Sequence, residues 1–378
     1  MSFLQSSALK CASAAFAAVI LGCGPRDGAD EFEQGKAAYE LRDLKKAETL
    51  FARSAVLAPQ DADRLLYLAR TELELGELAK AKDAVGRAAS CAEGDSDVKI
   101  LESQIAWHAK DYKTAANGFA EIANDASLDA SVRAQGWAGL GVVEMTCDNH
   151  HLARVAFLRA IRLDRRNAAA WYHLGLLYRD GFRYLEAALE QFEIFVRLEQ
   201  EASPRVQKVQ RTIIPGLKEE IARAATERPG AAKRNSSVCS TLIAEAEAAQ
   251  KKGNAKGARE AYQKAFAADP LSYQAALGLA KTWERTDASK AGQTRALEAY
   301  KAACALRPSA VSTFLAAGSL AAKLGLTLQS VEIYSRAVAA NPTSPDALDG
   351  LIRALRKSGG KAKVAEAYQS YRLSLAKK

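Results

Sequence analysis

The chain has 378 residues, a formal net charge of +9 and only 7% aromatic residues. Ala, Leu, Glu, Lys and Arg dominate, whereas clusters of Val, Ile and Thr are scarce, so the composition favours helices over strands. None of the six cysteines forms a C-x-x-C pair, which argues against a zinc cluster or a disulfide framework.

The first segment, residues 1–22, is predicted to be a signal peptide. No charged side chain occurs from Cys11 to Cys23, and Lys10 precedes this run. The run is shorter than the roughly 20 apolar residues of a membrane-spanning helix, and it fits the apolar core of a signal peptide. The tetrapeptide ILGC at 20–23 resembles the lipobox of bacterial lipoproteins, which implies lipid on Cys23 and attachment to a membrane. A signal peptide cut elsewhere and an apolar arm of a cytosolic protein are the alternatives.

The rest of the chain shows internal similarity. Residues 35–59, 247–270 and 318–342 each contain a helical segment, a short polar turn, a second helical segment and a closing proline. Proline ends a helix because it lacks the amide donor and clashes with the preceding turn. Pro308 and Pro342 are 34 residues apart. This pattern resembles the tetratricopeptide repeat (TPR), a helix–turn–helix unit of roughly 34 residues.

The clearest signature lies at residues 137–164. Gly141 and Ala153 would let two helices approach closely, while Phe157 fills the space between them. Nine units are predicted from the residue pairs of the second helices, which are Ala47/Phe51, Ala81/Val85, Ala115/Phe119, Ala153/Phe157, Ala188/Phe192, Ala258/Tyr262, Ala296/Tyr300, Ser330/Tyr334 and Val364/Tyr368. The resemblance implies an all-α fold, a right-handed superhelical solenoid in two arrays.

The repeats predict four segments along the chain. After the signal peptide, residues 23–199 form an N-terminal array of about five repeats, and residues 238–378 form a C-terminal array of about four. Residues 200–237 are predicted to hold two short capping helices, interrupted at Pro215, and a flexible tail over Pro229–Ser237. The extra residues 288–293 of the seventh repeat are expected in its turn. Net charge is −6 over 23–199 and +14 over 200–378, which points to different partners.

No catalytic arrangement is visible in the sequence. The motifs H-E-x-x-H and G-x-S-x-G are missing, and KSGGKAK lacks the spacing of a phosphate-binding loop. His150 and His151 fall in a predicted turn between helices, where a solvated role is more typical than metal binding. We therefore expect a non-enzymatic protein with no cofactor and no metal.

The first helices of TPR units line a concave groove, so the resemblance predicts the binding residues. In the N-terminal array the predicted peptide-binding residues are Tyr39, Tyr67, Arg70, Trp107, Met145, Tyr172 and Arg179, with Phe32, Lys36, His108 and His173 beside them. Such residue types are enriched at binding hot spots, although about half are expected to be ordinary packing between repeats. In the C-terminal array the equivalent positions are Leu279, Thr282, Trp283, Ser319 and Lys323, followed by a basic patch of Arg353, Arg356 and Lys357.

The function predicted from these features is a scaffold for protein–protein interaction. It would be lipid-anchored in the bacterial envelope, on the outer membrane facing the periplasm. There it would assist assembly of a pilus, secretion or polysaccharide-export complex by binding a protein or peptide. One alternative is an adaptor that binds peptidoglycan or another anionic envelope polymer through the basic array. The other is a cytosolic TPR scaffold, if the leader is retained. No nucleic-acid partner is expected for an exported chain.

Overall fold

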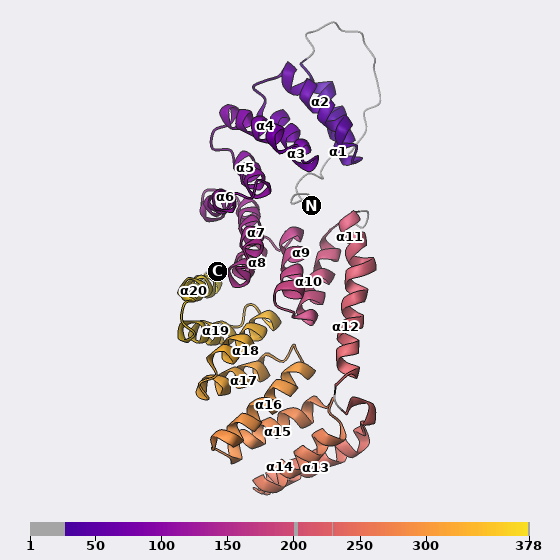
Figure 1. Ribbon diagram of the computed structural model, residues 1–378, viewed down its shortest axis with the longest axis vertical. Coiled ribbons are helices and arrows are strands. Elements are labelled where there is room, and N and C mark those ends of the chain that lie inside the picture. Colours follow the sequence, from indigo (N-terminus) through magenta and orange to yellow (C-terminus); the bar gives the residue numbers. More distant parts are fainter. Residues whose placement is uncertain (1–26, 200–202, 229, 377–378) are drawn as a thin grey trace. The chain divides into compact units, whose positions relative to one another are not determined.

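The computed structural model describes residues 27–199, 203–228 and 230–376, and over these residues the chain is helical without a strand (Figure 1). The predicted signal peptide and Cys23 lie outside the described residues. The chain forms two compact units, one ending at Leu174 and the other starting at Gly175. This boundary falls inside the fifth repeat, before the array boundary predicted at Glu199.

The N-terminal unit consists of helix pairs joined by short turns. Its helices are α1 (Ala29–Glu40), α2 (Leu44–Leu57), α3 (Ala62–Glu74), α4 (Leu78–Cys91), α5 (Ser96–His108), α6 (Tyr112–Asn124), α7 (Ala130–Thr146) and α8 (His150–Leu163), followed by most of α9 (Ala168–Leu176). The odd-numbered helices are the first helices of each repeat, and the even-numbered ones are the second helices.

The C-terminal unit completes the fifth repeat and adds four more. Its elements are η1 (Leu177–Gly181), α10 (Leu185–Leu198), α11 (Pro204–Lys208), η2 (Val209–Ile213), α12 (Ile214–Thr226), η3 (Ala231–Lys233), α13 (Ser236–Lys251), α14 (Ala255–Ala268), α15 (Tyr273–Thr286), α16 (Lys290–Leu306), α17 (Val311–Lys323), α18 (Thr327–Ala340), α19 (Pro345–Lys357) and α20 (Ala362–Ala376). Within the described residues, the nine predicted helix pairs are confirmed.

The turn inside the first repeat is set by two neighbouring residues. Arg42, which follows α1, has a φ of 63°, the left-handed conformation that commonly ends a helix. The Asp43 N–H donates to the Ala38 carbonyl at 2.9 Å, and the Asp43 side chain accepts from the Lys46 N–H at 3.3 Å. One residue thus closes the first helix and caps the second, so the two helices are forced to run antiparallel.

The predicted wedge between paired helices is present. The ring of Phe157 is fully buried between α7 and α8. A Cβ added at Gly141 would lie 2.5 Å from this ring, so only glycine lets α7 approach it. Ala153 and Ala160 are also fully buried. These residues therefore set the spacing inside the fourth repeat as the sequence predicted.

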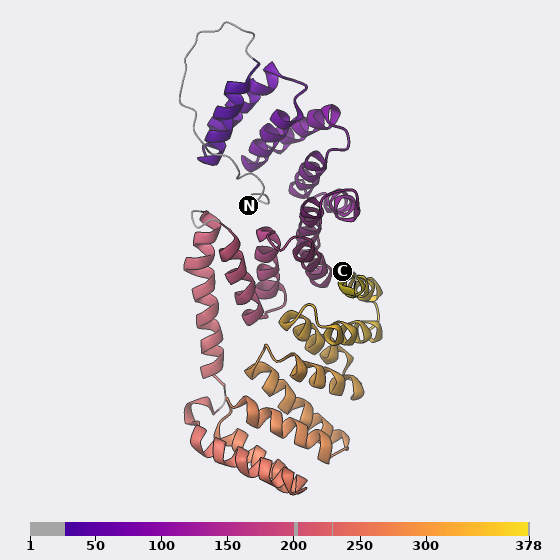
Figure 2. The ribbon, with the colours of Figure 1, turned by 180° about the vertical axis from the view of Figure 1, so that it is seen from behind.

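The predicted break at Pro215 is wrong. Residues 204–226 form one continuous helical run made of α11, η2 and α12 (Figure 2). Immediately before the proline the helix widens into a π turn, in which the Ile214 N–H donates to the carbonyl of Val209. A proline ring clashes with the carbonyl four residues earlier in a regular helix. The wider π turn accommodates the ring, and the helix continues.

The flexible tail predicted over Pro229–Ser237 overlaps the start of α13, which begins at Ser236. Asn235 caps this helix by accepting from the Val238 N–H at 3.0 Å, and its own N–H donates to the Ala268 carbonyl at 2.7 Å. The end of α14 thereby fixes the start of α13.

The extra residues 288–293 do not lengthen the turn of the seventh repeat, as was predicted; most of them begin α16. Ser289 caps this helix by accepting from the Gly292 N–H at 3.1 Å. The Gln293 amide donates to the carbonyls of Glu284 and Asp287, at 3.0 and 2.6 Å. The Gln293 side chain thus supplies hydrogen-bond donors to carbonyls at the C-terminal end of α15, and it holds the longer α16 against that end.

The unit boundary before α10 has a physical cause in the C-terminal unit. Helix α10 packs against α12, where Arg183 pairs with Glu220 at 2.6 Å. The Tyr184 hydroxyl donates to Glu332 of α18 at 3.1 Å, and the Arg336 guanidinium lies 5.1 Å from the Tyr184 ring centre. The second helix of the fifth repeat therefore belongs to the C-terminal unit, because it packs on α12 and because Tyr184, the residue before it, contacts α18.

Candidate functional site

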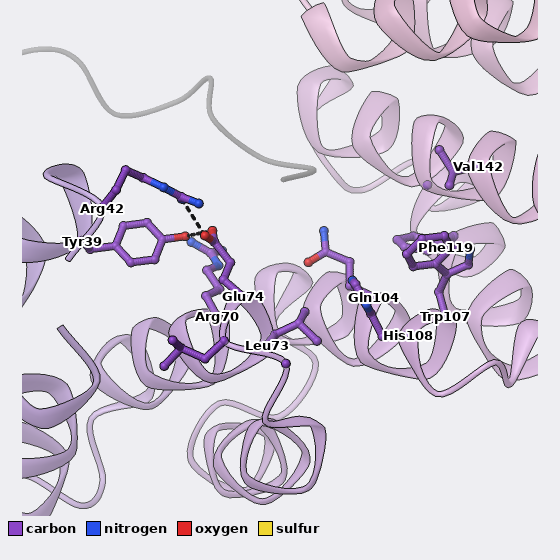
Figure 3. A pocket seen from close by; sticks show the side chains of 13 residues that line it. Tyr39, Arg42, Arg70, Leu73, Glu74, Gln104, Trp107, His108, Phe119 and Val142 are labelled. Carbon is purple, nitrogen blue, oxygen red and sulfur yellow. Dashed lines mark hydrogen bonds and ion pairs between the residues drawn. The ribbon is translucent and has the colours of Figure 1, made fainter. Parts of the chain in front are cut away.

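A cavity of about 400 Å³ opens among the first helices of the N-terminal unit (Figure 3). Successive first helices contact one another, α3 with α5 and α5 with α7, so they share one face. The side chains lining the cavity are those of Tyr39, Arg42, Arg70, Leu73, Glu74, Gln104, Trp107, His108, Phe119 and Val142, together with Leu75 and the glycines 76 and 139. One wall is polar and charged, and the other is mostly apolar.

The polar wall is organised around Glu74 of α3. Its carboxylate accepts from the Tyr39 hydroxyl of α1 and from the Arg42 Nη1 at 2.6 Å (Figure 3). Burial, followed by the hydrogen bond to Glu74, raises the pKa of Tyr39, so the phenol stays protonated at neutral pH. The network ties the first repeat to the second and leaves Glu74 neutralised by protein groups.

Arg70 is the second arginine of the polar wall, and it has an N–H donor that no described residue accepts. Its guanidinium lies 6.0 Å from the Tyr67 ring centre, and its Nη2 is 3.9 Å from the Asp97 carboxylate. The Arg70 Nε is buried and has no hydrogen-bond partner within the described residues. Since a guanidinium has five N–H donors, Arg70 can pair with a carboxylate or carbonyl of a ligand in the cavity.

Trp107 of α5 is held in place on the other wall. Its Nε1 donates to the Thr146 Oγ1 of α7 at 3.1 Å, and its ring centre lies 4.8 Å from that of His108, edge to face. The indole is half-buried. Because α5 and α7 both position it, a ligand meets a ring whose orientation is already fixed, which lowers the entropic cost of binding.

The structure brings three of the seven predicted groove residues into this cavity, namely Tyr39, Arg70 and Trp107. Tyr67 packs instead against Phe32 and Phe51, each at a ring-centre distance of 5.3 Å, so it belongs to the packing between repeats.

The other predicted residues do not line the cavity. Met145 and Tyr172 are half-buried, and the Tyr172 ring centre is 5.2 Å from that of His173. Arg179 lies in the C-terminal unit, where its Nε donates to Asp180 at 2.6 Å. The groove prediction for these three residues stays a prediction.

Arg42, Glu74 and Gln104 were missed by the sequence reasoning. Tyr39 and Glu74 are 35 residues apart, about one repeat, so they occupy neighbouring positions on adjacent first helices. A search for complementary side chains one repeat apart would have found the pair. Arg42 occupies the left-handed turn position, which gives no such signal.

The predicted basic patch has a local explanation in α19. Arg353, Arg356 and Lys357 are all exposed, and the last two fall in the final turn of the helix. Positive charge is favourable there because the carbonyl end of a helix carries partial negative charge. All three side chains are exposed to partners. The position of Arg356 and Lys357 at the end of the helix is by itself enough to explain why these two residues are basic.

The part of the chain that the structure describes bears on metal sites and membrane spans through its side chains and helices. It contains no group of three or more His, Cys, Asp or Glu side chains arranged to hold a metal ion. His150 and His151 are the first two residues of α8, so the prediction that they lie in the turn between helices is wrong; the His150 Nε2 is 3.7 Å from Asp148. No helix there combines the length and apolar character needed to cross a membrane.

The sequence profile of the tetratricopeptide repeat matches residues 32–97, 148–204 and 243–311, about half of the chain. The chain belongs to the tetratricopeptide repeat family. Comparison of this TPR protein with curated protein sequences gives no match.

Solved structures of similar fold were also found. PilF of Pseudomonas aeruginosa is 14% identical, with 66% of this chain and 95% of PilF covered and a TM-score of 0.39. PilW, described as a type IV pilus biogenesis factor, is 13% identical, with 66% and 96% covered and a TM-score of 0.39. The Cut9–Hcn1 assembly of the APC/C is 15% identical, with 93% and 79% covered and a TM-score of 0.36.

Proposed function

We propose that this TPR protein is a non-enzymatic scaffold that binds an extended peptide of a partner protein in the cavity of α1, α3, α5 and α7. The observation that carries the proposal is the convergence of Arg70 and Trp107 on one cavity whose other charges are neutralised internally. Arg and Trp are the residue types most often found at binding hot spots.

The size of the cavity limits how the partner binds. Ligand pockets range from about 300 to 1,000 Å³, and about 400 Å³ accommodates one or two side chains rather than a whole helix. We therefore propose that an apolar side chain of the peptide packs against Leu73, Trp107 and Val142. A neighbouring carbonyl or carboxylate then accepts from Arg70.

We propose further that Cys23 carries lipid and that the scaffold serves assembly of an envelope complex of the pilus, secretion or polysaccharide-export type. The support is the ILGC tetrapeptide at 20–23 behind an uncharged run. Stable anchoring requires two or more acyl chains, because a single chain binds only marginally. Metabolic labelling with a palmitate analogue is expected to mark the wild type and not Cys23→Ala. Equal labelling of both would contradict the anchor.

The second candidate function is an adaptor for an anionic envelope polymer. It is favoured by the net charge of +14 over residues 200–378 and by the exposed Arg353, Arg356 and Lys357. Such binding is carried by charge, so it should weaken strongly as salt screens it. Cosedimentation of the purified chain with peptidoglycan at low and high salt tests this function. If residues 1–22 are not cleaved, the protein would instead be a cytosolic TPR scaffold.

The experiment for the main proposal compares protein partners captured from intact membranes. The wild type, the double variant Arg70→Gln/Trp107→Ala and the control Arg53→Gln, an exposed residue of α2, are each used as bait, with mass spectrometry as readout. We expect a partner that the wild type and control capture and that the double variant loses. Capture of the same partners by all three folded proteins would contradict the cavity as the binding site.

A further inference from the structure

A second groove, of about 700 Å³, lies in the C-terminal unit between α14 and α16. Leu279 and Trp283 of α15 and Ala299 of α16 form its floor, and each is more than nine-tenths buried. Gln263 and Phe266 of α14 and Thr294 of α16 contribute to its walls. Since α14 and α16 are second helices, the groove opens on the side opposite to the contacts between first helices, of which α13 with α15 is one.

Two arginines converge on the tryptophan at one end of this groove. The Arg259 guanidinium of α14 lies 4.2 Å from the Trp283 ring centre, and that of Arg295 of α16 lies 4.9 Å from it. The sequence placed Trp283 on the face of the first helices, but its ring points between the second helices. Stacking on an indole holds a guanidinium by the attraction of the ring for a cation and leaves its N–H donors available.

These arginines differ from Arg336, another stacked arginine of the same unit. Arg336 lies on the Tyr184 ring and also pairs with Glu332 at 2.9 Å. Within the described residues, neither Arg259 nor Arg295 has a carboxylate oxygen within 4.0 Å. The one hydrogen bond recorded for the pair runs from Arg259 Nη1 to the Thr286 hydroxyl, at 3.3 Å.

The acidic side chains around the groove are engaged elsewhere or exposed. Asp287 accepts from the Ser289 N–H at 3.0 Å, and this hydrogen bond and, to a smaller extent, the charges of Arg259 and Arg295 lower its pKa. Glu298 lines the groove and pairs with Lys301 at 3.0 Å. Glu260 of α14 also lines the groove and is exposed. The end of the groove at Trp283 thus holds two guanidinium groups that have no carboxylate oxygen within 4.0 Å among the described residues, so their N–H donors can reach a carboxylate of another molecule.

We propose that this groove binds an acidic segment of a protein partner. Carboxylates of the segment accept from Arg259 and Arg295, and an apolar side chain next to them packs on Leu279 and Phe266. The net charge of +14 over residues 200–378 attracts such a segment over a longer range. This site lies on different helices from the cavity of the N-terminal unit, and it stands whether or not that cavity binds a peptide.

The test is fluorescence anisotropy with a labelled (Glu-Glu-Leu)4 peptide and the purified full chain. Charge-assisted hydrogen bonds are the strong ones, so Arg259→Gln/Arg295→Gln should weaken binding about 10-fold or more. The control Lys281→Gln/Arg285→Gln removes the same charge from exposed positions of α15 and should change binding less than about 2-fold, the size of a small surface-charge effect.

Three results would overturn the proposal. The first is unchanged binding by the folded Arg259→Gln/Arg295→Gln variant, and the second is an equal loss in the control, which would assign the binding to net charge. The third is competition by polygalacturonate, a non-protein polyanion, at the same concentration of carboxylates as the peptide. If the glutamine variant fails to fold, Arg259→Lys/Arg295→Lys keeps the charge and removes the planar donors, and it should still bind several-fold more weakly.

Discussion

The cavity of the N-terminal unit and the groove of the C-terminal unit use arginine in opposite ways. In the cavity, Arg42 pairs with Glu74, and the buried Nε of Arg70 has no hydrogen-bond partner among the described residues. In the groove, Arg259 and Arg295 are held by the Trp283 ring, without an ion pair among the described residues. The cavity lies among first helices and the groove among second helices of other repeats, so the comparison teaches that the two helices of a TPR unit offer separate faces for the two proposed kinds of binding. The cavity is suited to shape and apolar burial, and the groove to charge.

The largest expected effect tests whether the two regions are structurally independent. Phe51 is fully buried against Phe32 and Tyr67, so Phe51→Ala should lower the free energy of unfolding of the N-terminal unit by about 3–5 kcal/mol. Contacts in a solenoid are mainly between neighbours. Hydrogen exchange should therefore show lost protection in α1–α4 and unchanged protection in α15–α19. Equal loss in both regions would show that the units fold as one.

The next effect concerns a charge that the N-terminal unit leaves unpaired. Glu72 is buried, its Oε2 has no hydrogen-bond partner within the described residues, and burial raises its pKa from 4.5 to about 7. Because the pKa is higher in the folded state, this group favours folding fully below pH 4.5, and that contribution is lost as the pH rises through 7. Glu72→Gln should therefore stabilise the unit at pH 8 by about 1–3 kcal/mol.

Urea unfolding at pH 5 and pH 8 measures this difference. The wild type should lose more stability between the two pH values than Glu72→Gln does. The control Glu121→Gln, at an exposed position of α6, should behave as the wild type. An identical pH dependence in Glu72→Gln and the wild type would show that the carboxyl of Glu72 titrates normally.

The smallest effect concerns the link between the first two repeats. Tyr39→Phe removes the hydroxyl that donates to Glu74 and should cost about 1 kcal/mol, since Arg42 still neutralises the carboxylate. Tyr112→Phe, in α6, serves as a control because no hydrogen bond of its hydroxyl is recorded within the described residues. Thermal melting of both variants gives the comparison. Equal melting temperatures would mean that the Tyr39 hydrogen bond contributes nothing to stability.

Much of the fold was predictable because the repeat signature is local. Gly141, Ala153 and Phe157 specify how two helices pack, and the same positions recur along the chain. The π turn before Pro215 and the start of α16 were not predictable in this way. They depend on hydrogen bonds such as those of Gln293 with the end of α15, which join residues whose proximity the sequence pattern does not give.

The candidate sites were predictable only in part. The register of the first helices placed Tyr39, Arg70 and Trp107 on one side of the N-terminal unit. The same register placed Trp283 on the wrong side of α15, because a large residue near the end of a first helix can also pack toward the second helices. Tyr67 was assigned to the groove although neighbouring aromatic rings cover it, since its burial depends on Phe32 and Phe51 of other helices.

The most direct test of the account is to compare Trp107→Ala with Tyr67→Ala for binding to the partner captured from membranes. Truncating a buried hot-spot residue typically costs about 2 kcal/mol or more, roughly a 30-fold loss of affinity. We expect that loss for Trp107→Ala, measured on the folded fraction. Tyr67→Ala should lower the melting temperature and leave the affinity of its folded fraction within about 2-fold of wild type. If folded Trp107→Ala binds as tightly as wild type, the cavity is not the binding site.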